Sequence, residues 1–166
     1  DAAGVRERQC VVGLPLKWAL TTHIEVPALP EADVPSFLQI EAERGFPCDI
    51  ETLHIGTSRF RSLDGKQYAT LVGIPKNHLA LLERALRAAK LKPISLSLGI
   101  TALQPAGAEA SNGVMALIIG ESHVGLQVTA GGGVAALRAL EGALEAEGSQ
   151  RVLHADLVAR EARITL

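Results

Sequence analysis

Apolar and polar positions alternate along this chain in two rhythms, one typical of strands and one typical of helices. Trp18–Val26 alternates at every second residue, which predicts a strand with one buried face. Pro30–Arg44 carries its apolar residues three and four positions apart, which predicts an amphipathic helix. The predicted strands are Gln9–Leu14, Trp18–Val26, Leu53–Phe60, Gln67–Ile74, Ile94–Ile100, Val114–Ile119, Gly125–Ala130 and Val134–Leu140, and the predicted helices are Pro30–Arg44, Asn77–Ala89 and His154–Leu166.

Turn residues separate these elements. Asp64-Gly65 predicts a hairpin between two strands, because glycine supplies the positive φ that such a turn requires. Gly131–Gly133 predicts a second hairpin turn, and the small, polar residues of Gln104–Gly113 predict a linker. We expect Gly45 to end the first helix in the left-handed conformation, with Phe46 folding back against that helix.

The second predicted helix has an apolar stripe on one side. Leu79, Leu82 and Leu86 recur at helical spacing, while the charged residues between them fall on the other side. We expect Leu82 and Leu86 to be buried beneath the strands that precede and follow this helix.

Composition adds limits on location and partners. The chain has 166 residues, of which 48% are apolar and 20% are charged, as in ordinary globular proteins. The net charge of −2 gives no basic surface, so nucleic acid is not an expected partner. No apolar run approaches the ~18 residues of a membrane span, and the opening residues do not have the pattern of a signal peptide. Cys10 and Cys48 match no metal or redox spacing, so we expect two small buried side chains in a cytoplasmic protein.

Side chains that carry chemistry do not form catalytic patterns. The five histidines never stand four residues apart or beside a cysteine, so no metal site is expected. Ala130–Gly133 is glycine-rich, but the Lys-Ser/Thr of a P-loop does not follow it. The serines lack the Gly-x-Ser-x-Gly motif that activates a nucleophile.

The last predicted helix stops without the Gly, Asn or Pro that usually closes a helix, which favours an excised piece of a larger protein. In such a piece the strand Gln9–Leu14 would lack a neighbour, and Ile164 and Leu166 would be partly uncovered. Open strand edges and apolar patches favour association, so we expect a homodimer, with the linker Gln104–Gly113 as a hinge for exchange.

Four segments together resemble a known family. VVGLP (Val11–Pro15) is a strand ending in proline, THIEVPALPEAD (Thr22–Asp33) is a strand with an LP turn, and LQIEAERGFPCDIE (Leu38–Glu51) is a Glu-rich helix with a Phe-Pro loop. ATLVGIPKNHLALLERALRAAKLKPISL (Ala69–Leu96) is a strand, a crossover helix and a strand. In this order and spacing they resemble the PilM/GspL-like family of type IV pilus assembly and type II secretion proteins. Lys90 stands where that family usually has glycine.

This resemblance implies an α+β fold of the actin-like ATPase, or ribonuclease H-like, class with an inserted ferredoxin-like subdomain. Residues 1–105 would form part of the first lobe, comprising the inserted β-α-β-β subdomain and a crossover helix. Residues 106–166 would form the start of the second lobe, with a β-hairpin and a helix.

The resemblance also places MALIIGESHVGLQV at the second phosphate loop, where the family has Asp, then Gly, then a hydroxyl residue. Asp would organise Mg²⁺ and water, and Gly would let the backbone approach a phosphate. Ile118 holds the Asp position and Val124 the hydroxyl position. Gly120, Glu121 and Ser122 are therefore expected to form a degenerate loop that binds no cofactor. The family's first phosphate loop, Gly-x-Asp-x-Gly, does not occur in this sequence.

A scaffold rather than an enzyme is therefore the function that the resemblance implies. Family members bind the short cytoplasmic tail of a single-pass membrane partner and a motor ATPase. That implies a cytoplasmic component of a type IV pilus or type II secretion platform, peripheral to the inner membrane and not inserted into it. An apolar groove or sheet edge would accept an extended peptide. Glu41, Glu43 and Phe46, on the helix of the inserted subdomain, are the expected partner contacts.

Two alternatives remain open. The chain could be a nucleotide-binding actin-like ATPase whose first phosphate loop lies outside this sequence, or a free-standing ferredoxin-like interaction module. Nucleotide titration tests the first alternative, and the topology of residues 113–166 tests the second.

Overall fold

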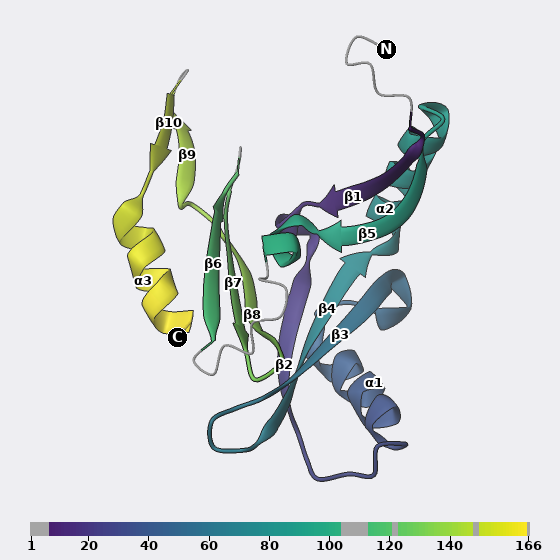
Figure 1. The fold of residues 1–166 in the computed structure, drawn as a ribbon, viewed down its shortest axis with the longest axis vertical. Coiled ribbons are helices and arrows are strands. Elements are labelled where there is room, and N and C mark those ends of the chain that lie inside the picture. The colour runs from purple at the N-terminus through teal and green to yellow at the C-terminus, as the bar shows by residue number, and fades with distance from the viewer. Residues whose placement is uncertain (1–6, 104–112, 121–122, 148–149, 166) are drawn as a thin grey trace.

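A computed structural model describes residues 7–103, 113–120, 123–147 and 150–165 (Figure 1). The strands are β1 (Gln9–Leu14), β2 (Leu20–Val26), β3 (Leu53–Arg61), β4 (Gln67–Pro75), β5 (Lys92–Leu98), β6 (Val114–Ile119), β7 (Val124–Ala130), β8 (Gly133–Leu140), β9 (Leu144–Glu147) and β10 (Gln150–Leu153). The helices are α1 (Val34–Gly45), α2 (Lys76–Ala88) and α3 (Ala155–Thr165). Within the described ranges, no helix is long and apolar enough to span a membrane.

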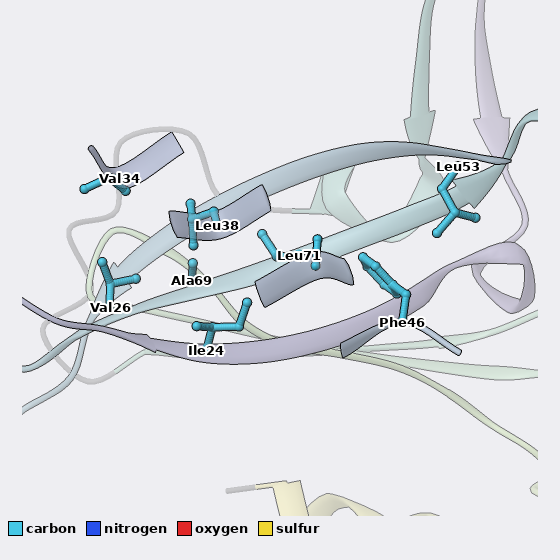
Figure 2. Close-up of a cluster of buried hydrophobic side chains, with 9 residues drawn as sticks. Ile24, Val26, Val34, Leu38, Phe46, Leu53, Ala69 and Leu71 are labelled. Atoms are coloured by element: carbon cyan, nitrogen blue, oxygen red, sulfur yellow. The ribbon is translucent and has the colours of Figure 1, made fainter. Parts of the chain in front are cut away.

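The segment β2-α1-β3-β4 forms a three-stranded antiparallel sheet, ordered β2-β4-β3, with α1 on one face. Burial between helix and sheet is nearly complete, since Ala69 and Leu71 of β4 are at most 1% exposed. Figure 2 shows their side chains between β4 and the residues of α1 that face the sheet, including Leu38. Apolar burial of this kind is the main force that holds a helix on a sheet.

Gly45 and Phe46 close α1 in a way that corrects one expectation. Gly45 does not adopt a positive φ. Its role is close packing, because a Cβ at this position would lie 2.9 Å from the Thr22 hydroxyl oxygen. Phe46 does fold back, as predicted, and its N–H donates to the carbonyl of Ala42 at 3.1 Å.

β1 and β5 form a parallel pair, and α2 is the crossover helix that precedes β5. Leu79 of α2 is buried against Leu14 and Ile74. The expectation that Leu82 and Leu86 are buried is wrong, because both are only half-buried. Leu79, the first leucine of the apolar stripe, is therefore more deeply buried than Leu82 and Leu86, which follow it.

Three further strands form the antiparallel sheet β6-β7-β8, and α3 packs on one of its faces. The β6, β7, β8 and α3 predictions are confirmed within a few residues. The β9–β10 hairpin was not predicted. The hinge role expected of Gln104–Gly113 falls on residues 104–112, which lie outside the described residues.

β8 joins the two sheets through polar contacts with its main chain. Thr70 donates to the Val134 carbonyl at 2.6 Å, and Ser58 accepts from the Val134 N–H at 2.9 Å. Added Cβ atoms on Gly131 and Gly133 would overlap the main chain of β3, so only glycine permits this approach. In Figure 1 the β6-β7-β8 sheet therefore stands on the side of β2-β4-β3 away from α1.

The two cysteines do not match the expectation of burial. Cys48 is exposed in the loop after α1, and Cys10 on β1 is half-buried. Both carry free thiols. Phe46 is the residue that enters the core at this end of α1, and residues 47–49 after it are exposed.

Candidate functional site: a groove along the free edge of β3

β3 is an edge strand whose outer edge is open over its first half. It pairs with β4 on one side only. Arg61 donates its N–H away from β4, to the Gly131 carbonyl at 3.0 Å. Successive peptide groups along a strand point in opposite directions, so residues an even number of positions apart point the same way. Thr57 and Ile55 therefore direct their N–H and C=O groups away from β4, as Arg61 does. The β7–β8 turn approaches this edge at Arg59 and Arg61 only, so the earlier peptide groups face no described strand.

A groove of about 450 Å³ lies beside this edge, on the face of the sheet opposite α1. Its walls come from β3, β4, α2 and β5. Its apolar floor consists of Leu14, Val72, Ile74, Leu79, Leu96 and Leu98. The size falls within the usual range for small-molecule and cofactor pockets, about 300–1,000 Å³.

Gly56 forms part of the β3 wall of this groove. Its φ is not positive, and a Cβ built there meets nothing within 4 Å. Neither the backbone conformation nor neighbouring atoms therefore require glycine. What glycine does at this position is keep the groove open. The sequence pattern predicts no role for Gly56, because an isolated glycine in a strand pattern carries no information about what it faces.

Polar groups lie only on the rim, where His54 of β3, Glu83 of α2 and Ser97 of β5 line the groove. An apolar floor with a few rim polar groups and an adjacent row of unpaired peptide groups suits an extended peptide. Its main chain would pair with β3, and alternate side chains would enter the groove.

The predicted partner contacts on α1 separate into two kinds. Phe46 is a core residue, 6% exposed, and packs against β2 and β3, so it offers no contact surface. Glu43 is exposed, and Glu41 forms an ion pair with Arg44 at 3.0 Å. Only these carboxylates, which lie away from the β3 groove, are at the surface.

The expected phosphate loop lies at the β6–β7 connection. Gly120 donates its N–H to the His123 carbonyl at 3.0 Å, so this amide is used within the turn. Ile118 packs against the core between the sheets, and Val124 is buried beneath α3. Glu121 and Ser122 lie outside the described residues. In the described part of the chain, no three His, Cys, Asp or Glu side chains are grouped as metal ligands.

Taken together, the inserted β2-α1-β3-β4 unit, the parallel β1–β5 pair with its crossover helix and the second antiparallel sheet define the class. The chain has the α+β architecture of the actin-like ATPase fold. The fold-class expectation is confirmed.

Two solved structures show this architecture in particular proteins. One is a chain of the PilM-PilN type IV pilus biogenesis complex, with 26% identity, a TM-score of 0.64, and coverage of 81% of this chain and 43% of that one. The other is the cytoplasmic domain of EpsL, an inner-membrane component of the type II secretion system of Vibrio cholerae, with 17% identity, a TM-score of 0.59, and coverage of 77% and 50%. This chain therefore spans about half of each neighbour or less. No family model matches the chain, and no curated protein matches it.

Proposed function

We propose that this chain is a cytoplasmic scaffold of a type IV pilus or type II secretion inner-membrane platform, of the PilM/GspL-like kind. In this role it binds the cytoplasmic tail of a membrane-anchored partner and also meets a motor ATPase. The observation that carries the proposal is the open β3 edge above an apolar groove, in a fold similar to a chain of the PilM-PilN complex.

Binding occurs by strand addition in this proposal. The tail pairs with the outward peptide groups of Ile55 and Thr57 and places alternate apolar side chains over Leu79 and Leu98. Main-chain pairing provides affinity, and the apolar floor provides selectivity for the tail. The carboxylates of the exposed Glu43 and the half-buried Glu41 remain partner contacts in this proposal, on a separate surface of α1.

The test uses a peptide of the cytoplasmic tail of the PilN-type protein from the same organism, titrated calorimetrically into this chain. We expect saturable binding that Gly56→Ile weakens by about tenfold or more, because isoleucine fills the groove at an anchor position. The fold should survive this change, since β-branched residues favour strands and nothing lies within 4 Å of the new Cβ.

Thr57→Ile is the matched control. It adds a similar side chain one residue away, on the opposite face of β3, and should leave tail affinity unchanged. Equal loss in both variants, or unchanged affinity in Gly56→Ile, would place the tail elsewhere on the molecule.

A further inference from the structure

The side of α2 that faces away from the strands, its outer side, is open and carries positive charge. Leu79 faces the strands, while Leu81 and Arg84, three positions apart, share the outer side. Leu81 is 66% exposed, and together with Arg84 it lines a shallow hollow whose walls come from α2 alone. Because a single helix forms this surface, it has no second wall to hold a peptide or a small molecule.

The net charge of −2 predicts no basic surface, yet cations gather around the C-terminal end of α2. The stretch RALRAAKLK, from Arg84 to Lys92, contains four cations and no carboxylate. Arg8 joins them, because Lys92 donates its N–H to the Arg8 carbonyl at 2.8 Å, beside the start of β1 (Figure 1). All five cations are exposed, and none is in an ion pair with another described residue: Arg8, Arg84, Arg87, Lys90 and Lys92.

Two carboxylates lie near these cations in the chain. Glu83 lines the β3 groove, on the other side of α2. Glu7 accepts the main-chain N–H groups of Arg8 and Gln9, at 2.9 and 3.0 Å. With both carboxylates counted in full, five cations and two carboxylates leave a local charge of +3. Charges more than about 10 Å away are largely screened at moderate salt, so this local excess decides what the surface attracts.

Exposed apolar side chains lie in the same stretch as the cations. Leu91, between Lys90 and Lys92, is 37% exposed, and Ile94 of β5 is 59% exposed. Together with Leu81 they place apolar groups beside cations on a surface without a pocket. Basic and apolar side chains combined in this way are typical of protein surfaces that lie on an anionic membrane, where the cations meet lipid phosphates and the apolar groups enter the headgroup layer.

We infer that the outer side of α2, with the adjoining starts of β1 and β5, is a docking surface for an anionic lipid bilayer. The five cations contact the lipid phosphates, and Leu81 and Leu91 enter the headgroup layer, so the chain lies on the membrane. An acidic protein is a poorer partner, because the cations are spread over a helix end, a loop and two strand starts and line no groove. This surface is separate from the β3 groove, and the inference does not depend on the proposed function.

Sedimentation with vesicles tests the inference. The chain is mixed with vesicles of phosphatidylcholine alone, or with vesicles that also contain phosphatidylglycerol. Near an anionic bilayer each cation raises membrane affinity by about fivefold, so a local charge of +3 should favour the anionic vesicles by about a hundredfold. Added salt should weaken this binding, because it screens the phosphates.

Variants of α2 then locate the surface. Arg84→Glu combined with Arg87→Glu makes the local charge negative and should abolish sedimentation with anionic vesicles. Arg84→Gln combined with Arg87→Gln keeps good helix formers in place and should weaken binding by about twenty-five-fold, or fivefold for each charge. Leu81→Gln should weaken binding by about fivefold, because it removes an apolar side chain from the headgroup layer.

Arg151→Glu combined with Arg163→Glu is the matched control. It makes the same charge change at two exposed arginines of β10 and α3, which Figure 1 shows on the opposite side of the molecule from α2. Vesicle binding should be unchanged. Equal binding to neutral vesicles, no binding to anionic vesicles at about 5 mM lipid, or equal loss in the control would overturn the inference. Tighter binding to a polyglutamate peptide than to anionic vesicles would also overturn it and assign the surface to an acidic protein.

Discussion

Gly45 and Lys90 lie at the C-terminal ends of α1 and α2 and differ in backbone conformation. Sequence signals placed the left-handed conformation at Gly45, yet Lys90 is the residue that adopts it, with φ of 57°. Leu91 donates to the Leu86 carbonyl and Lys90 donates to the Arg87 carbonyl, which is the Schellman pattern. The similar family usually has glycine at this position, where glycine carries no Cβ penalty.

Replacing Lys90 with glycine should therefore stabilise the protein. A non-glycine residue in the left-handed region costs roughly 1 kcal/mol, so Lys90→Gly should raise the free energy of unfolding by about 0.5–1 kcal/mol. Urea unfolding measures this change. Lys90→Ala is the control, because it removes the side chain and retains the Cβ, and it should give no such gain.

Gly45→Ala should lower the free energy of unfolding, although replacing glycine with alanine in a helix usually raises it. Alanine normally stabilises a helix by about 0.5–1 kcal/mol, but here its Cβ would lie 2.9 Å from the Thr22 hydroxyl oxygen. We expect a loss of about 1–3 kcal/mol, typical of overpacking. In a double-mutant cycle, Thr22→Ala should recover part of it. Additive losses in that cycle would show that this contact is not the cause.

At the scale of elements, the helical stripe of α2 was predicted correctly, but its most buried position was not. Leu79 is 7% exposed, whereas Leu82 and Leu86 are half-buried. Periodicity gives the side of a helix, but the depth of each residue depends on where the strands lie beneath it. The sequence pattern also does not predict β9 and β10. Their segments are short and include the charged residues Glu145, Glu147 and Arg151.

Truncation of α2 should follow burial rather than periodicity. Leu79→Ala should cost about 2–5 kcal/mol, because it leaves a cavity against Leu14 and Ile74. Leu86→Ala should cost distinctly less, since its side chain already meets water. Denaturant unfolding of the two variants decides the order, and a larger loss at Leu86 would contradict the packing of α2 described above.

At the scale of the whole molecule, the second sheet contains the segment that the resemblance places at a phosphate loop. Val124 is a core residue, Ile118 is half-buried against the core, and Gly120 uses its amide within the turn. We expect no calorimetric signal for Mg-ATP at about 1 mM. Heat of binding that disappears in Gly120→Val would contradict this prediction and favour the nucleotide-binding alternative.

Association is the second prediction at this scale. β6 is an edge strand among the described residues, and it exposes Met115, Leu117 and Ile119 on one face. Ile164 on α3 is 67% exposed. Open, uncharged strand edges favour pairing with another copy, so we expect a dimer in light scattering. Leu117→Lys should shift it toward monomer on dilution, and a strictly monomeric chain at about 100 μM would exclude the dimer.

By itself the sequence determined the order of most elements, the two hairpin turns and the resemblance to an actin-like fold. These follow from spacing and turn chemistry within a few residues, which act before the chain is folded. Only the tertiary structure decided that Phe46 is buried and that Gly56 opens a groove. Those outcomes depend on contacts between distant residues, such as Thr70 with Val134, 64 positions apart. Strand pairing on one edge leaves the other edge open, and no local pattern in the sequence records which edge that is.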